Sequence, residues 1–414
     1  MATRNEHPNL LNSFATASPR YVRGWAIVAV LFWLALLTGD WFVRLVEFRW
    51  QDKWLPLPVA TGQPARTAES FVVPAETGGG LTKMVPVPRV AARYAEFHAE
   101  KIAYRDERGY FNEASPSSGY YPILMLGDSF LVSQETQTVA QALSNVSGHP
   151  VYNHGSAAAG PFLEMRRYLA ADHLDPKPAI VVWDLAAREL GAGLFQRQPI
   201  ASWFRQTSHN KEIGAPAKPS IQWNNLMPDR VRRDWPNTSI LAFFGRQLWG
   251  QIKLLAFQEW PWDVVGRDDP VFGPMLFYRE NLRVLPLLTP GENAQAIVGV
   301  VQRIADEFRS RGQTLTVLLI PEKEQIHLRA LSREDQQGLA GGDQLLAEIE
   351  MGLQAQGIPV VNLMPVFRNA TEQRQRLYWR DDTHWNDAGI RLAAEEIWRV
   401  IEPLLKTSEK MDGR

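Results

Sequence analysis

The chain has 414 residues, of which 45% are hydrophobic and 21% are charged, a composition typical of a folded protein with room for one large domain or two smaller ones. Its 44 Lys and Arg residues nearly balance 45 Asp and Glu residues, so it lacks the positive field with which proteins bind nucleic acid. It contains no cysteine, which excludes thiol catalysis, disulfide bonds and cysteine-ligated zinc.

An uncharged apolar run near the N-terminus extends from Gly24 to Gly39. At about 1.5 Å per residue this run is slightly shorter than a hydrocarbon core of roughly 30 Å, but Arg23 can snorkel and the flanking tryptophans suit the membrane interface. We therefore predict a single transmembrane anchor over residues 22–43, behind a cytoplasmic tail of residues 1–21. A cleaved signal peptide is the alternative.

Residues 44–90 are rich in Pro, Gly, Thr and Val without a helical period, and we predict a tether there. Residues 91–405 are predicted to form one domain. From about Tyr120 onward, short apolar runs alternate with amphipathic stretches, which is typical of an α/β fold with a parallel sheet. The predicted strands are residues 122–126, 151–153, 179–185, 314–320 and 358–363, and the predicted helices are residues 293–311, 343–356 and 386–404.

Residues 195–290 interrupt this alternation with sequence rich in Trp, Pro and Arg, including the apolar stretch Ser239–Phe257. We predict a helical or irregular insertion that packs on the core, with a carbohydrate-binding or membrane-facing surface as the alternative. Residues 406–414 are predicted to form a C-terminal tail.

The sequence Gly127-Asp128-Ser129-Phe130 lies where a predicted strand ends and a helical segment begins. A serine at such a turn exposes its hydroxyl, and its own N–H can face a developing oxyanion. Ser129 is therefore a candidate nucleophile for attack on an ester. The alternative is a simple helix start, in which Asp128 or Ser129 is the N-cap.

A second group of polar residues, Asp381-Asp382-Thr383-His384, precedes the last predicted helix. Histidine supplies a base that titrates near neutral pH, and a carboxylate close before it can fix the tautomer of its ring. An ordinary polar cap on the helix is the alternative for His384 taken alone. The eight histidines show no H-x-x-x-H or H-E-x-x-H spacing, and no glycine-rich nucleotide loop is present, so we expect no metal and no other cofactor.

With these motifs the chain resembles the SGNH/GDSL hydrolase superfamily, and more closely its alginate O-acetyltransferase-like branch. The resemblance rests on GDSF at 127–130 and DTHWN at 382–386, with support from VVWDLAAREL at 181–190 and LLIPEK at 318–323. It implies a three-layer sandwich with a parallel sheet. The alginate enzymes place Asp-x-His before the serine, whereas here it follows the serine, as is usual in the superfamily.

The resemblance implies a catalytic triad in which Ser129 is the nucleophile, His384 is the base and Asp382 orients His384. The superfamily's wider Asp-x-x-His spacing selects Asp381 as the alternative to Asp382.

The resemblance also implies groups that stabilise an oxyanion, but the superfamily's Gly-x-Asn is missing from this chain. Gly160, with Gly155 as the other candidate, is expected to supply an oxyanion N–H. Arg188 is expected to approach the site, and a salt bridge from Arg188 to Asp184 or Glu189 is the alternative.

The resemblance implies an O-acyltransferase, and specifically an O-acetyltransferase, that modifies an exported polysaccharide through an acyl-enzyme. The expected location is the bacterial inner membrane, with a single span and the catalytic domain in the periplasm. The expected partners are the polysaccharide acceptor and a membrane-bound acyltransferase that delivers the acyl group. A carbohydrate esterase that uses water as acceptor and a non-catalytic polysaccharide-binding assembly protein are the alternatives.

Overall fold

The computed structural model describes residues 27–28, 30–35, 38, 69–113, 119–132, 137–157, 160–171, 177–196, 240–260 and 263–411. The chain divides into two compact units, one made of Met1–Leu57 and Pro219–Trp249 and the other of Pro58–Lys218 and Gly250–Arg414. Every candidate site residue named above lies in the second unit.

The described residues of the predicted anchor are helical, and their apolar side chains are exposed, from 53% for Leu34 to 61% for Phe32. Most of the predicted span of residues 22–43 lies outside the described residues. Within the part of the chain that the structure describes, no helix is long and apolar enough to cross a membrane. The anchor therefore stays a prediction.

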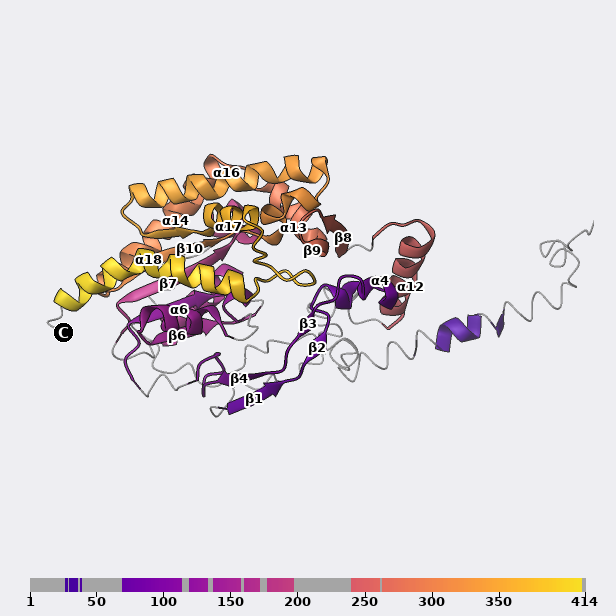
Figure 1. Cartoon of the computed structure of the whole chain (residues 1–414), viewed down its shortest axis with the longest axis horizontal. Helices are drawn as coiled ribbons and strands as arrows, with labels where there is room; N and C mark the ends of the chain where they lie inside the picture. The colour runs from indigo at the N-terminus through magenta and orange to yellow at the C-terminus, as the bar shows by residue number, and fades with distance from the viewer. Residues whose placement is uncertain are drawn as a thin grey trace, which may run out of the picture. The chain divides into compact units, whose positions relative to one another are not determined.

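The second unit is built around a five-stranded parallel sheet with the strand order β11-β10-β7-β5-β6 (Figure 1). All residues of β5 and β7 are buried, which explains why these strands appear in the sequence as continuous apolar runs. The predicted parallel α/β sheet is confirmed. Its strands are β5 (Ile123–Gly127), β6 (Val151–Gly155), β7 (Ile180–Ala186), β10 (Thr314–Ile320) and β11 (Val360–Asn362).

Helices cover both faces of this sheet. The chain moves from β5 to β6 in one direction, and from β6 through β7 and β10 to β11 in the other. Right-handed crossovers therefore place α6 on one face and α7, α14 and α16 on the other, while α18 packs on α6. The helices are α5 (Ser129–Val132), α6 (Val139–Ser147), α7 (Gly160–Ala171), α8 (Ala192–Gln196), α14 (Glu292–Ser310), α15 (Lys323–Ile326), α16 (Arg333–Ala355), α17 (Leu363–Glu372) and α18 (Asp387–Met411).

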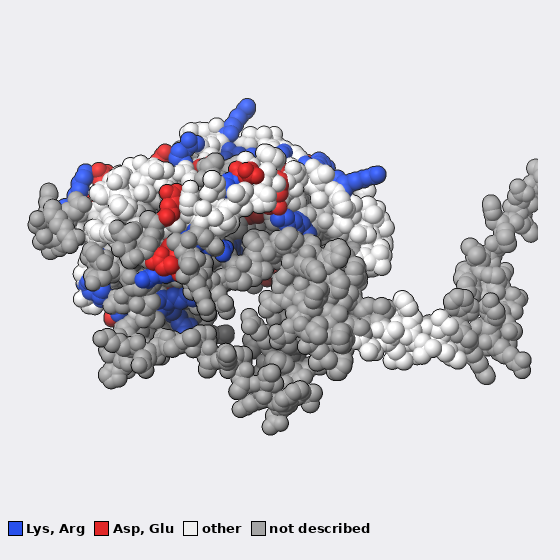
Figure 2. All heavy atoms as spheres, turned by 90° about the horizontal axis from the view of Figure 1, so that it is seen from below, with Lys and Arg blue, Asp and Glu red and all other residues white. Residues whose placement is uncertain are grey.

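Charged side chains of both signs are interspersed on the described surface of the face seen in Figure 2. The described residues also form exposed ion pairs, such as Arg93 with Asp268 at 2.7 Å and Lys406 with Glu402 at 2.6 Å. The mixed surface agrees with the near balance of acidic and basic residues in the sequence.

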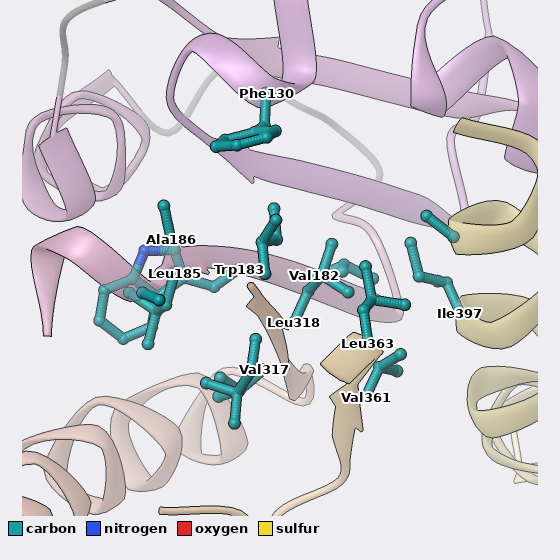
Figure 3. Packing of buried hydrophobic residues seen from close by; sticks show 14 of the residues in the cluster. Phe130, Val182, Trp183, Leu185, Ala186, Val317, Leu318, Val361, Leu363 and Ile397 are labelled. Atoms are coloured by element: carbon teal, nitrogen blue, oxygen red, sulfur yellow. The ribbon is translucent and has the colours of Figure 1, made fainter. Parts of the chain in front are cut away.

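The core joins the central strands to the helices on either side of them. Figure 3 shows Val182 from β7 and Leu318 from β10 beside Leu363 and Ile397 from the helices that follow. These four side chains are fully buried. Burial of such a side chain contributes roughly 1.5–3 kcal/mol, so this cluster stabilises the packing of the central strands against α17 and α18.

Two segments differ from their predicted structure. The described half of the predicted tether forms β1 (Glu69–Val73), β2 (Glu76–Thr77) and α4 (Pro88–Ala91), and β1 and β2 pair with β4 (Lys101–Arg105) and β3 (Phe97–His98). The predicted helical or irregular insertion contains α12 (Ile240–Ala256) but also an antiparallel hairpin, β8 (Val264–Asp269) with β9 (Gly273–Tyr278), followed by α13 (Arg279–Val284). The hairpin is specified by the turn Asp269–Gly273, where Gly273 has a φ of +78°.

A matched pair of glycine substitutions tests how closely the strands approach. A Cβ on Gly127 would lie 1.8 Å from Asp184 Oδ1, so Gly127→Ala is expected to lower the free energy of unfolding by about 1–3 kcal/mol. Gly299 lies in α14 with open space around it. Gly299→Ala is therefore expected to raise the free energy of unfolding by up to about 1 kcal/mol. Urea unfolding measures both values, and equal effects would contradict the close approach at Gly127.

Candidate active site

Ser129 is the first residue of α5, directly after the buried strand β5. The turn between them is held by two carboxylates. The Asp128 N–H donates to Asp184 Oδ1 at 3.1 Å, and the Phe130 N–H donates to Asp128 Oδ1 at 2.9 Å. Asp128 therefore caps the short helix, as the alternative interpretation of this motif expected, and the Ser129 hydroxyl stays available for other contacts.

His384 lies next to Ser129 although 255 residues separate them in the chain. Its Nε2 is 2.9 Å from Ser129 Oγ, and its Nδ1 is 2.6 Å from Asp382 Oδ1. The Phe130 ring packs edge-on against the imidazole at 5.2 Å between ring centroids. With Nδ1–H donating to the carboxylate, Nε2 is the acceptor for the serine proton, so the three side chains form the hydrogen-bonded chain that a serine nucleophile needs.

Asp382 is held in its ionised form. Burial alone would raise the pKa of its carboxyl, but the His384 charge and hydrogen bonds from the His384 ring, the Gly80 N–H and the His384 N–H together hold that pKa well below its ordinary value. The Gly80 N–H donates to Asp382 Oδ2 at 2.8 Å, and the His384 N–H donates to Oδ1 at 3.0 Å. Asp382 is thus an ionised acceptor for His384 at neutral pH.

Asp381, the alternative partner of His384, faces the N-terminal segment. Its Oδ2 accepts from the Gly79 N–H at 2.8 Å and from the Glu96 N–H at 2.7 Å. Its Oδ1 lies 3.3 Å from His98 Nε2, and its side chain is fully buried. The structure therefore brings Ser129, His384 and Asp382 together. Asp381 instead binds residues 79–98 to the loop that carries Asp382 and His384, here called the histidine loop.

The glycine run Gly78-Gly79-Gly80 makes this fastening possible, and the sequence interpretation missed it. A Cβ on Gly79 would lie 2.8 Å from the Asp381 carbonyl oxygen, and one on Gly80 would lie 2.7 Å from Asp382 Oδ2. Three consecutive glycines in a segment without low-complexity character are the signal that could have indicated a close backbone approach.

Arg188 lies beside the nucleophile turn, but its salt bridges differ from those considered in the sequence. Its Nη1 is 2.8 Å from Glu322 Oε2 and its Nη2 is 3.4 Å from Asp128 Oδ2, instead of pairing with Asp184 or Glu189. The guanidinium lies over the Phe130 ring, 5.2 Å from its centroid. Arg188 therefore supports the turn that carries Ser129, and 22% of its side chain remains exposed.

The two candidate oxyanion glycines differ in their surroundings. The Gly155 N–H donates to Asn153 Oδ1 at 3.0 Å, so this amide is already engaged. Gly160 is the first residue of α7 and has a φ of +63°, a conformation that favours glycine. Residues 158–159, just before it, lie outside the described residues. Gly160 stays the candidate donor, and Gly155 has a structural role.

Two further histidines that could line a cleft are buried against carboxylates of their own. His154 Nδ1 lies 3.1 Å from Glu164 Oε2, and His327 Nδ1 lies 3.3 Å from Asp269 Oδ2 beside a cavity of about 100 Å³. Among the described residues, no group of three or more His, Cys, Asp or Glu side chains could hold a metal ion.

The C-terminal part of the chain, residues 275–413, matches the family described as SGNH hydrolase-like domain, acetyltransferase AlgX. This chain resembles the AlgX/AlgJ-like branch of the SGNH hydrolases. The matched part includes Asp382 and His384, while Ser129 precedes it.

Relatives from this branch match only part of the chain. The probable alginate O-acetylase AlgJ of Pseudomonas aeruginosa is 29% identical over 158 residues, which cover 38% of this chain and 38% of AlgJ. The protein of the same description from Pseudomonas fluorescens is 21% identical over 181 residues, which cover 44% of this chain and 43% of that protein. The matches thus span less than half of these AlgJ proteins.

Among solved structures, a lipase/acylhydrolase from Enterococcus faecalis superposes with a TM-score of 0.33 and 11% identity, covering 68% of this chain and 96% of that one.

Glu189 is a half-buried acid close to Asp128. Burial, and then the neighbouring Asp128 carboxylate, raise the pKa of Glu189 to about 9. Burial also raises the pKa of Asp184 well above its ordinary value, again with Asp128 as the nearest like charge. Glu189 therefore keeps its proton at neutral pH, which limits the repulsion among the acids around the turn that carries Ser129.

Replacing Glu189 by Gln tests whether the Glu189 side chain is protonated at neutral pH. Because the pKa of Glu189 rises from 4.5 to about 9 on folding, the folded chain keeps a proton that the unfolded chain releases, and rising pH lowers the free energy of unfolding over that range. Glu189→Gln is neutral throughout, so its stability relative to the wild type is expected to increase between about pH 5 and about pH 8. Urea unfolding at both pH values measures this, with the exposed Glu395→Gln as control. A relative stability that does not change with pH would show that Glu189 is ionised.

A comparison of Asp382→Asn with Asp381→Asn tests which carboxylate serves His384. Asp382→Asn is expected to lower kcat on p-nitrophenyl acetate by about 10⁴-fold with the fold intact, because an amide no longer fixes the tautomer of the imidazole. Asp381→Asn is expected to act mainly on the thermal midpoint, because it disturbs the contacts to Gly79 and Glu96. The reverse pattern would assign the catalytic role to Asp381.

Proposed function

We propose that this protein is a serine O-acyltransferase that transfers an acetyl group to an exported polysaccharide. The observation that carries the proposal is the continuous hydrogen-bonded chain from Ser129 Oγ through His384 to Asp382. The AlgX family match and the AlgJ relatives, described as probable alginate O-acetylases, support acetyl transfer to a polysaccharide as the reaction.

The first half of the proposed reaction makes an acyl-enzyme. His384 Nε2 takes the proton of Ser129, and Oγ forms a bond to the acetyl carbonyl carbon of the donor. The carbonyl π electrons move to the oxygen, where the Ser129 and Gly160 N–H groups are proposed to stabilise the oxyanion. When the carbonyl re-forms, the bond to the donor's leaving group breaks, and His384 returns its proton to that group. Asp382 stabilises the imidazolium throughout this half-reaction.

The second half transfers the acetyl group to the acceptor. His384 removes the proton of a sugar hydroxyl, whose oxygen attacks the acetyl-serine and forms a second tetrahedral intermediate. The bond to Ser129 Oγ then breaks, and Oγ recovers a proton from His384. Water in place of the sugar would give acetate, which is the esterase outcome with the same residues.

The N-terminal segment is proposed to place this reaction outside the cytoplasm. The exposed apolar helical residues between Ile27 and Leu34 support a membrane anchor over residues 22–43, with the catalytic unit in the periplasm. We further propose that a membrane-bound acyltransferase supplies the acetyl group, because activated acetyl donors are made in the cytoplasm and the proposed acceptor lies outside it.

Replacing Ser129 by Ala tests the nucleophile. We expect the variant to keep its fold and to lose transfer activity by roughly 10⁴- to 10⁶-fold, because the acyl-enzyme can no longer form. Fluorophosphonate labelling of the wild type, read by intact mass, should add one group, and the variant should add none. Ser310→Ala on the surface of α14 is the matched control. A variant that still labels would place the nucleophile elsewhere.

A product assay separates transfer from hydrolysis. The full-length protein in detergent is given p-nitrophenyl acetate with and without a neutral or uronic-acid oligosaccharide. Transfer predicts a mass increase of one acetyl group on the oligosaccharide and a faster release of nitrophenol when it is present. Release of acetate alone, at a rate independent of the sugar, would establish an esterase, and no turnover with unlabelled Ser129 would favour a binding protein.

A further inference from the structure

The segment Pro321–Glu324, at the end of β10, lies between the two halves of the candidate site. On one side Glu322 accepts from Arg188 at 2.8 Å, and Arg188 in turn lies 3.4 Å from Asp128, the residue before the nucleophile. On the other side the next residue, Lys323, reaches the loop that carries Asp382 and His384. One short segment thus reaches the serine turn through Arg188 and contacts the histidine loop directly.

The Lys323 side chain is fully buried, and its ammonium group donates to three backbone carbonyls. Nζ lies 2.6 Å from the Leu276 oxygen in β9, 2.9 Å from the Arg380 oxygen and 3.0 Å from the Asp382 oxygen. Two of these carbonyls belong to the histidine loop, and one belongs to the triad carboxylate residue itself. Because the same loop also receives the Leu276 N–H at the Arg380 oxygen, at 2.7 Å, its position depends on this cluster of contacts.

We propose that Lys323 is a positioning residue whose ammonium group, by holding the Arg380 and Asp382 carbonyls, fixes His384 in register with Ser129. The proposal rests on the proposed function of the triad and adds a charged group that acts on it without contacting the substrate. Fixing the donor and acceptor atoms of the triad matters because a misplacement of about 1 Å can cost about 10²-fold in rate.

Lys323 must be charged to donate hydrogen bonds to all three carbonyls. An ammonium group has three N–H donors, one for each of the three carbonyls. A neutral amine has two donors and a lone pair, which would face the third carbonyl oxygen and repel it. Loss of the proton therefore releases at least one of the three contacts, and two of the three belong to the histidine loop.

The surroundings of Lys323 place this proton loss near physiological pH. Burial lowers the pKa of Lys323 to about 8, against the attraction of the Glu324, Asp382, Asp381 and Glu96 carboxylates, which opposes the shift. The Phe277 ring of β9, with its centroid 5.3 Å from Nζ, adds a cation–π contact. A rise in pH through about 8 is thus expected to loosen the histidine loop.

Fluorophosphonate labelling of Ser129 as a function of pH tests the inference on the full-length protein. The wild-type labelling rate should fall as pH rises through about 8. Lys323→Met lacks the three contacts at every pH, so at neutral pH it should label about 10²-fold more slowly, without a further fall near that pH. Lys323→Arg keeps its charge at every accessible pH but presents a planar fork to the carbonyls, so it should also be slow and show no fall.

A surface lysine provides the control for this experiment. Lys406→Met removes an exposed lysine of α18 and should reproduce the wild-type rate and profile. Circular dichroism checks folding, and if Lys323→Met is unfolded, the charged Lys323→Arg variant and the wild-type profile decide. Wild-type rates in both variants, or a fall near pH 8 that persists in Lys323→Arg, would overturn the role of Lys323. A wild-type protein that does not label at all would instead overturn the assignment of Ser129, and with it both proposals.

Discussion

The arrangement of the candidate site depends on the ionised Asp382 carboxylate. This group accepts hydrogen bonds from the Gly80 N–H, the His384 N–H and the His384 ring, and these contacts together outweigh the cost of its burial. A carboxylate with fewer donors would take up a proton and release the imidazole. The donors come from two distant parts of the chain, so Asp382 has all of them only when the segment with Gly80 has docked on the loop that carries Asp382 and His384.

A second feature of the candidate site is the group of acids around Arg188, beside the turn that carries Ser129. Asp128, Asp184, Glu189 and Glu322 crowd around Arg188, and a single guanidinium cannot neutralise four carboxylates. Burial leaves a proton on Glu189, so the cluster contains a neutral carboxyl group as well as charged acceptors. Such a cluster holds the serine turn rigid without placing a large negative charge beside a serine that must become nucleophilic.

The sheet and the three side chains that the structure brings together, Ser129, His384 and Asp382, could be predicted because they depend on local patterns. β10 has the predicted bounds, since an apolar run rich in β-branched residues between Gln313 and Pro321 specifies a buried strand. Helix α16 begins ten residues earlier than expected, at Arg333. Its glycines at 338, 341 and 342 break the apolar pattern in the sequence, and two of them approach Pro286 and the Leu288 carbonyl closely, at 3.1 Å and 3.2 Å from their Cβ positions. In that helix packing overrides propensity.

The contacts that support the triad were not predictable in the same way. Arg188 and Glu322 are separated by 134 residues, and Gly80 and Asp382 by 302, and nothing in either local sequence indicates its partner. The choice between Asp381 and Asp382 depended on the direction in which each side chain leaves the loop. The Gly79 and Gly80 amides hold the two carboxylates in these directions, and the three consecutive glycines indicate a close approach but not its partner.

The docking of residues 79–98 on the histidine loop changes where the functional boundary of the protein lies. A fragment that begins at residue 91, the predicted start of the domain, would retain Ser129, His384 and Asp382 and the entire central sheet. It would nevertheless lack the amides of Gly79 and Gly80, leaving the two adjacent aspartates short of donors. Residues 79–98, which follow the proposed anchor in the sequence, are therefore part of the candidate site and more than a tether.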